Sequence, residues 1–134
     1  RPGAAGPASV DQPSADFARE INPDPVLLFR YSALTFNSHR IHYDRDYACD
    51  VEGYDGLVVQ GPLTATLLLD LLYREMPGCT LLDFEFRGLA PLLDTGVIVL
   101  QGRRDGNTVE LWATGSGAAM AMTARATLAE ADSE

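Results

Sequence analysis

The reactive side chains of this chain are concentrated in one short polar segment, Phe36–Asp44, with the sequence FNSHRIHYD. Both histidines of the protein, His39 and His42, lie in it, and Asn37 stands five residues before His42. Imidazole is the side chain best suited to moving a proton near neutral pH, and a carboxamide can hold a water or a substrate group. The segment therefore predicts proton transfer. The spacing of the two histidines would suit a metal pair, but the sequence suggests no third ligand, so we predict no metal site.

A second motif, Val58–Leu63, places a glycine at the mouth of a long apolar helix. Backbone N–H groups at a helix start have no partner within the helix and attract negative charge. Pro62 has no N–H, so the Gly61 N–H is the natural donor there. Glycine also lets a ligand approach the backbone closely. A thioester carbonyl gathers negative charge when its β-carbon is attacked, so we predict that Gly61 is an oxyanion donor.

Two helices are expected to position these motifs. Asp24 and Pro25 predict an N-cap followed by a short helix over Val26–Leu34. A polar loop with a helical turn near Tyr43–Ala48 should follow.

The second helix is the longest apolar one and is expected from Leu63 to about Met76, where Pro77 and Gly78 stop it. Its leucines leave little polar surface, so the rest of the fold should enclose it.

After this helix the apolar period changes from 3.6 to 2 residues, which predicts strands. Leu82, Phe84 and Phe86 are expected on a buried face, and the charged residues between them on a wet face. Three more strands are expected over residues 97–101, 109–114 and 118–128, with a hairpin turn at Asp105-Gly106. The predicted fold is α+β, with an antiparallel sheet of about four strands wrapped around the long central helix, which is the hot-dog arrangement. Such a small sheet leaves an edge that a second domain would cover.

Composition narrows the possible partners. The chain has 134 residues and a formal net charge of -9, which argues against nucleic acid and against an anionic membrane surface. Its two cysteines have no metal-ligand spacing, and no apolar run is long enough to span a membrane. We expect a cytoplasmic location. Residues 1–16 are rich in Pro, Ala and Gly and predict a flexible linker or tail. Residues 17–131 are predicted to form the hot-dog domain.

The runs LLFRYSALTFNSHRIHYD and EGYDGLVVQGPL resemble the C-terminal half of the MaoC-like, type 2 hydroxyacyl-thioester dehydratases. Mesaconyl-CoA hydratase-like members are the closest in pattern. The broader MaoC signature is Asp, any residue, Asn-Pro, an aliphatic residue and His. Here Asn37 takes the Asp place, His42 the His place and Ile41 the aliphatic place, while His39 and Arg40 stand where Asn-Pro would be.

This resemblance implies a hydro-lyase that hydrates 2-enoyl thioesters or dehydrates 3-hydroxyacyl thioesters, without a cofactor. His42 would be the general base, Asn37 would fix the water, and the Gly61 N–H would polarise the thioester carbonyl. The predicted substrate contacts are Arg40, Gln60 and Leu63.

The residues around the predicted site leave two roles open. Arg40 either contacts a phosphate of coenzyme A or braces Asp44 or Asp46. Asp44 either orients a histidine or, as we prefer, caps the next helical turn.

Two alternatives to the hydro-lyase remain. A hot-dog thioesterase needs a carboxylate near the central helix, but Asp70 lies about two turns inside it. The chain could also be a half-domain that is inactive without an upstream hot-dog partner. The expected partners are therefore an acyl-CoA substrate, which the acidic surface favours over a carrier protein, and a second hot-dog domain, either a second copy in a homodimer or an upstream half.

Overall fold

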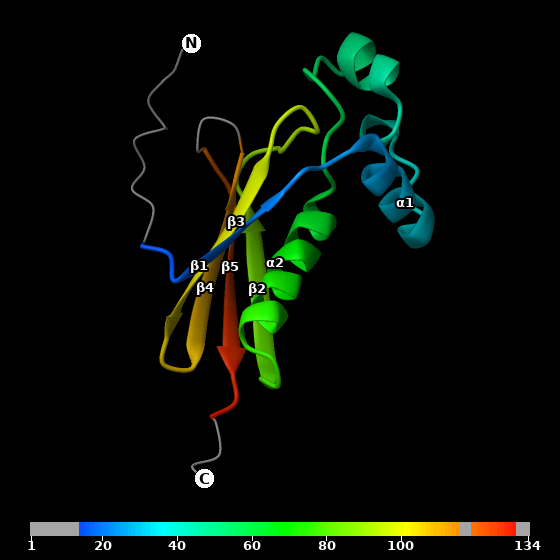
Figure 1. Cartoon of the computed structure of the whole chain (residues 1–134). Helices are drawn as coiled ribbons and strands as arrows, with labels where there is room; N and C mark the ends of the chain where they lie inside the picture. Colours follow the sequence, from blue (N-terminus) through cyan, green and yellow to red (C-terminus); the bar gives the residue numbers. More distant parts are fainter. Residues whose placement is uncertain (1–13, 116–118, 131–134) are drawn as a thin grey trace.

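The computed structural model describes residues 14–115 and 119–130. Most of the predicted linker, residues 1–16, and the first residue of the predicted last strand, Ala118, lie outside the described residues. One antiparallel five-stranded sheet lies against one long helix, α2 (Gly61–Glu75), and a second helix, α1 (Pro25–Thr35), stands beyond the end of the sheet (Figure 1). The predicted α+β fold, an antiparallel sheet around a central helix, is confirmed.

The strand order in the sheet is β1-β3-β4-β5-β2, and every neighbouring pair is antiparallel. The strands are β1 (Phe17–Ile21), β2 (Leu81–Gly88), β3 (Ile98–Asp105), β4 (Thr108–Thr114) and β5 (Met120–Leu128). The sequence does not predict β1, which pairs with the outer side of β3. Its Phe17 ring lies so close to Gly102 that any Cβ there would overlap it. This close packing of a ring on a glycine fixes β1 on the sheet.

Residues next to its two ends determine where helix α1 begins and ends. The Asp24 carboxylate accepts a hydrogen bond of 2.8 Å from the Leu27 N–H, and Pro25 is the first helical residue. The helix ends at Phe36, whose φ of 54° lies in the left-handed region. There the Asn37 N–H donates to the Ser32 carbonyl at 2.9 Å, which closes the last turn. The polar segment that contains the predicted site therefore begins directly at the C-terminal cap of α1.

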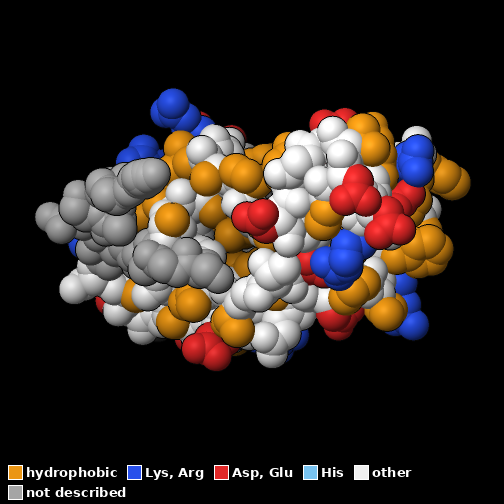
Figure 2. Space-filling view, turned by 90° about the horizontal axis from the view of Figure 1, so that it is seen from above, with side chains coloured by type: hydrophobic (Ala, Val, Ile, Leu, Met, Phe, Trp, Pro, Cys, Tyr) orange, Lys and Arg blue, Asp and Glu red, His pale blue; other side chains and the backbone are white. Residues whose placement is uncertain are grey.

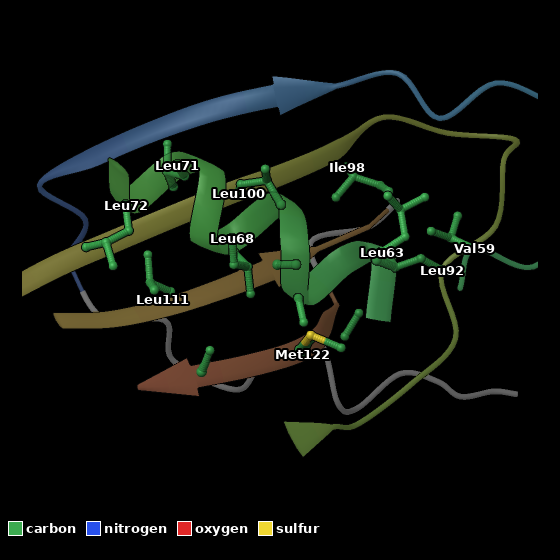
Figure 3. Packing of buried hydrophobic residues seen from close by; sticks show 14 of the residues in the cluster. Val59, Leu63, Leu68, Leu71, Leu72, Leu92, Ile98, Leu100, Leu111 and Met122 are labelled. Atoms are coloured by element: carbon green, nitrogen blue, oxygen red, sulfur yellow. The ribbon is translucent and has the colours of Figure 1, made fainter. Parts of the chain in front are cut away.

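The hydrophobic core lies between α2 and the sheet. Leu68, Leu71 and Leu72 of the helix are buried against the strands, where Leu100 of β3 and Leu111 of β4 are also buried (Figure 3). The helix is less enclosed than its composition suggests. The polar residues of its outer side form a row of contacts at the surface, in which Asp70 bonds to Arg19 at 3.0 Å and to Arg74 at 2.6 Å. One face of α2 therefore supplies the core and the opposite face remains accessible.

The burial expected for β2 is wrong at two of its three apolar residues. Leu82 is 64% exposed and Phe86 is 49% exposed, and only Phe84 is half-buried. A register shift between Leu81 and Asp83 changes which residues face the core. In addition, β2 is the last strand of the sheet that the described residues form. Among the described residues, no strand pairs with the outer edge of β2.

Among the residues that the structure describes, no helix has the length and apolar character needed to cross a membrane.

Candidate active site

His42 lies in a tight turn between the two helices. The polar segment forms a 3-10 turn at Arg40–His42, in which the imidazole of His42 is buried to 8% exposure. Its Nδ1 lies 2.7 Å from the Val58 carbonyl oxygen. A carbonyl can only accept, so Nδ1 carries the hydrogen and Nε2 keeps a free lone pair. The backbone of the protein thus fixes the tautomer that a general base needs.

The surroundings of His42 also favour its neutral form. Burial lowers the pKa of His42 below its usual value of 6.5, the hydrogen bond to Val58 opposes this shift, and the nearby His39 adds to the lowering. The imidazole is therefore neutral at pH 7 and able to accept a proton.

Asn37 is held at the start of the same segment. Its Oδ1 accepts a hydrogen bond of 3.1 Å from the His39 N–H, and its Nδ2 donates to no acceptor among the described residues. The side chain is half-buried. Asn37 can therefore donate to an oxygen atom in the site, but it cannot transfer a proton.

The start of α2 offers two unpaired backbone donors. Thr64 N–H bonds to the Gln60 carbonyl at 3.1 Å, and Pro62 has no N–H. The N–H groups of Gly61 and Leu63 donate to no acceptor within the described residues. A Cβ added to Gly61 would meet nothing within 4 Å, so the space in front of this residue is open. Together with the positive end of the helix dipole, this open space suits an oxygen atom that gains negative charge.

Hydrogen bonds join the turn that carries His42 to Val58, in the segment just before α2. Val58 N–H donates to the Ile41 carbonyl at 2.9 Å, while the Val58 carbonyl receives the His42 ring. The other side of this segment is fixed by the loop before β3, because Val59 N–H donates to the Leu92 carbonyl at 2.8 Å. The His42 imidazole is therefore bonded to Val58, which stands three residues before Gly61 in the sequence.

Gln60 connects the two helices rather than facing solvent. Its side chain is fully buried, and Nε2 donates to the Leu28 carbonyl and to Ser32 Oγ, both at 2.8 Å. Its Oε1 accepts no hydrogen bond from the described residues. Leu63, a second predicted substrate contact, has its side chain in the hydrophobic core. Both residues line the interior behind the helix start, and a direct contact of either side chain with substrate stays a prediction.

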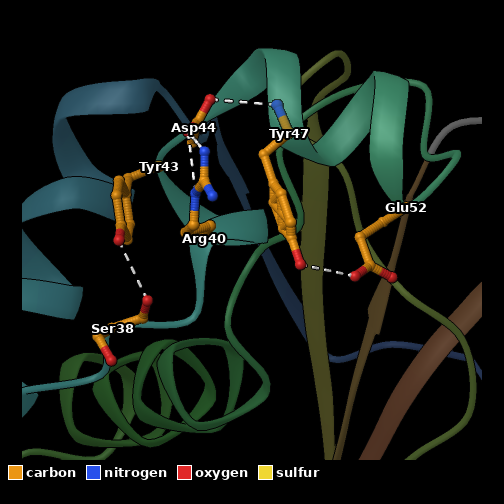
Figure 4. Close-up of polar contacts among 6 residues, drawn as sticks. All are labelled: Ser38, Arg40, Tyr43, Asp44, Tyr47 and Glu52. Atoms are coloured by element: carbon orange, nitrogen blue, oxygen red, sulfur yellow. Dashed lines mark hydrogen bonds and ion pairs between the residues drawn. The ribbon is translucent and has the colours of Figure 1, made fainter.

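Arg40 lies in a neighbouring polar cluster. Its guanidinium donates two hydrogen bonds, of 3.1 and 2.7 Å, to Asp44 and lies 4.3 Å from the centre of the Tyr47 ring (Figure 4). Asp44 also accepts from the Tyr47 N–H at 3.1 Å, which confirms its predicted role as a cap. Arg40 therefore braces Asp44, and its contact with a coenzyme A phosphate stays a prediction. This ion pair holds the pKa of the Asp44 carboxyl below its usual value.

An apolar groove of about 400 Å³ borders Asn37. Its walls include the Phe29 and Tyr43 rings, which meet edge to face with centres 6.4 Å apart, and Phe36, which is 93% exposed. Hydrophobic side chains are visible at the α1 end of the molecule, on the right of Figure 2. The groove could hold an apolar part of a ligand next to the polar site.

Sequence reasoning misses two groups of this site. The Val58 carbonyl that fixes the His42 tautomer leaves no mark in the sequence, because any residue carries a carbonyl. Ser32, which receives the Gln60 amide, is one of three hydroxyl-bearing residues of α1, with Tyr31 and Thr35, so its residue type alone does not single it out.

Comparison with known proteins identifies the family. Residues 2–94 match the family model described as hydroxyacyl-thioester dehydratase type 2. This chain belongs to that family. The type 2 dehydratase match includes the polar segment and the start of α2, so it covers Asn37, His42 and Gly61.

Two curated relatives are similar to this type 2 dehydratase chain. It is 49% identical over 127 residues to the mesaconyl-C(4)-CoA hydratase of Chloroflexus aurantiacus, which covers 92% of this chain and 45% of the relative. It is 44% identical over 71 residues to the mitochondrial hydroxyacyl-thioester dehydratase type 2 of Schizosaccharomyces pombe, covering 52% of this chain and 24% of that protein. The chain thus spans less than half the length of the curated relatives it matches.

Similarity to solved structures identifies the fold. The MaoC-like dehydratase from Phytophthora capsici superposes with a TM-score of 0.77 at 13% identity, over 96% of this chain and 47% of that one. The (R)-hydratase from A. caviae superposes with a TM-score of 0.71 at 18% identity, over 91% of this chain and 100% of that one. At this identity the likeness concerns the fold alone, which is the hot-dog fold.

Proposed function

We propose that this chain carries the proton-transfer site of an enzyme that hydrates 2-enoyl thioesters or dehydrates 3-hydroxyacyl thioesters. The observation that carries the proposal is the combination of two features, a neutral His42 whose tautomer is fixed and backbone N–H groups at the start of α2 that have no acceptor among the described residues. A base for water and a donor for a developing oxyanion are the two groups that conjugate addition of water to a thioester requires.

In the hydration direction, His42 Nε2 takes a proton from water as the oxygen bonds to the β-carbon of the enoyl group. The electrons of the double bond move toward the α-carbon and the thioester oxygen, which the Gly61 N–H stabilises. One such donor contributes about 10²–10³-fold in rate. Asn37 Nδ2 donates to the attacking water and orients it. Addition is complete when the α-carbon receives a proton, and dehydration reverses these steps.

Two observations support coenzyme A as the carrier and a short diacid acyl group as the substrate class. The formal net charge of -9 disfavours docking of an acidic carrier protein. The relative with 49% identity is named for a mesaconyl-CoA thioester. The groove beside Asn37 would accept the apolar part of the thioester.

The proposed partner is a second hot-dog domain that pairs with the free edge of β2. The exposed apolar residues on and next to this edge, Leu82, Phe86 and Leu89, are the kind that an interface covers. A second domain is supported by length as well, because the chain aligns with 45% of the Chloroflexus relative and with 47% of the Phytophthora structure. We also propose a reducing compartment such as the cytoplasm, in keeping with the free thiols of Cys49 and Cys79.

The thioesterase alternative is disfavoured by the surroundings of Asp70. Its carboxylate is engaged by Arg19 and Arg74, on the outer side of α2. It is therefore not free to attack a carbonyl or to activate water.

The test is to mix the complete gene product with mesaconyl-CoA and, separately, with crotonyl-CoA. We expect loss of the enoyl-thioester absorbance without release of free thiol, and formation of a hydroxyacyl-CoA by mass spectrometry. Release of coenzyme A with the acyl group unchanged would replace the hydro-lyase by a thioesterase. The absence of any reaction with either thioester would refute the proposed function.

A further inference from the structure

Addition of water to an enoyl thioester involves two proton movements, one away from water and one to the α-carbon. His42 can perform the first. Asn37 has no titratable group, and its Oδ1 is already bonded to the His39 backbone. The site described so far therefore contains a single proton carrier for two proton movements.

We propose that His39 is the second proton carrier of this site, delivering the proton to the α-carbon while His42 takes the proton from water. The inference rests on the proposed hydratase activity and adds a catalytic residue to it.

The backbone holds the two imidazoles side by side. His39 precedes the 3-10 turn Arg40–His42, and the His42 N–H donates to the His39 carbonyl at 3.2 Å. Side chains three residues apart eclipse one another in such a turn. The two rings accordingly meet edge to face, with centres 5.6 Å apart and planes at 80°.

The surroundings of the two imidazoles suit them to different roles in proton transfer. His42 is buried and bonded to a carbonyl through Nδ1, which suits a base. His39 is exposed, so its imidazole can exchange a proton with solvent. The two rings also interact electrostatically, because the charge of His39 lowers the pKa of His42.

Within the described residues, no other titratable side chain forms a hydrogen bond or ion pair with either imidazole. Four nearby groups bond elsewhere, namely Arg40 to Asp44, Tyr47 to Glu52, Arg45 to Asp94, and the Tyr43 hydroxyl to the Ser38 carbonyl. Asp46 and Asp50 are exposed. His39 is thus the titratable side chain that packs directly against His42.

The proton balance closes over one turnover. The cycle begins with neutral His42 and protonated His39. Water gives one proton to His42 Nε2 and its hydroxyl to the β-carbon, and the His39 imidazolium gives one proton to the α-carbon. His42 is then protonated and His39 neutral. Transfer of a proton from His42 to His39 through solvent restores both residues, and the substrate has gained one water.

The pH dependence of kcat/KM tests this division in the complete gene product. The wild type should show a bell shape, because the reaction needs one group that accepts a proton and one that donates a proton. His39→Asn should lower kcat by about 10²–10⁴-fold and remove the high-pH limb, with KM changed by less than about threefold. Adding Asn37→Asp to His39→Asn supplies a carboxyl group and should recover at least about tenfold of that rate.

Asp46→Asn is the control, because Asp46 is exposed close to this segment and forms no hydrogen bond or ion pair with either imidazole in the described residues. It should leave kcat and the profile unchanged. Activity of His39→Asn within about threefold of the wild type, or retention of its high-pH limb, would overturn the inference.

A second measurement separates this inference from the proposed function. NMR titration of the imidazole protons should show that the pKa of His42 rises when His39 is replaced by Asn. An unchanged titration of His42 would overturn the pairing of the two rings, whatever the activity. Failure of the wild type to hydrate any thioester, with the rise in pKa present, would instead remove the proposed substrate class and leave the coupled pair.

Discussion

Replacing the buried Gln60 by methionine is a sharp test of how the site is assembled. The change removes two hydrogen bonds donated to Leu28 and Ser32, which together contribute about 1–3 kcal/mol. It also removes the carbonyl Oε1, which has no partner within the described residues and whose burial costs about 1–3 kcal/mol. Methionine is close to glutamine in volume and leaves no large cavity. The two effects offset each other, so the free energy of unfolding should change by less than about 1 kcal/mol.

Activity should respond differently from stability. Without the amide, α1 and the start of α2 are no longer tied together, so the position of Asn37 relative to Gly61 becomes less fixed. A small misplacement of reacting groups can cost about 10²-fold in rate, and we expect a fall in kcat of about tenfold or more. Chemical denaturation and steady-state kinetics on the same preparation provide both numbers.

The control for Gln60→Met is Gln101→Met, because Gln101 accepts a single hydrogen bond from Trp112 at 3.0 Å, in the sheet. This variant should retain full activity. A loss of more than about 3 kcal/mol in Gln60→Met would show that Oε1 makes a strong interaction, since two neutral hydrogen bonds account for no more. Unchanged kcat would show that the link between α1 and α2 does not position the site.

Three further outcomes follow from the site and the fold. Gly61→Ala should leave the melting temperature unchanged, because the new Cβ meets open space, but it should lower kcat/KM for the thioester by about tenfold, equivalent to about 1.4 kcal/mol of transition-state binding. Because burial lowers the pKa of His42, the unfolded chain binds more protons than the folded one just below pH 6.5. Stability should therefore decline as pH falls through 6.5 toward the lowered value, and His42→Asn should flatten this part of the curve in calorimetry. Replacing Leu82 and Phe86 by Lys should abolish association with a second hot-dog domain in sedimentation experiments, while Val51→Lys, an equally exposed control away from β2, should not.

Local sequence chemistry predicts the helices well. The Asp24 carboxylate and Pro25 fix the start of α1 through contacts within four residues, and the apolar run of α2 needs the core in any fold. The hairpin turn predicted at Asp105-Gly106 lies one residue later, at Gly106-Asn107, where Gly106 adopts the left-handed conformation with φ of 64°. Such signals act over short distances and can be recognised without knowing the fold.

Long-range pairing explains what the sequence does not predict. β1 pairs with β3 across some eighty residues of chain, as in the partnership of Phe17 with Gly102, and its own five residues carry too little pattern to predict it. The exposure of Leu82 and Phe86 depends on β2 being the last strand in the sheet, which a strand's own alternation does not reveal.

The same distinction applies to the site. Asn37, His42 and Gly61 could be selected from residue types and spacing, because imidazole, carboxamide and glycine each have a specific chemistry. The burial of Gln60 and the bond from His42 to the Val58 carbonyl depend on how the helices meet, so no local pattern predicts them.

In the proposed reaction, His42 Nε2 moves the proton during conjugate addition of water. The most direct test is the rate of mesaconyl-CoA hydration by the complete gene product carrying His42→Gln, beside the wild type. Loss of the imidazole should lower kcat by about 10²–10⁴-fold, as expected for removal of a general base, with KM changed by less than about threefold. A variant that folds normally and keeps kcat within about threefold of the wild type would contradict the assignment of His42 as the base.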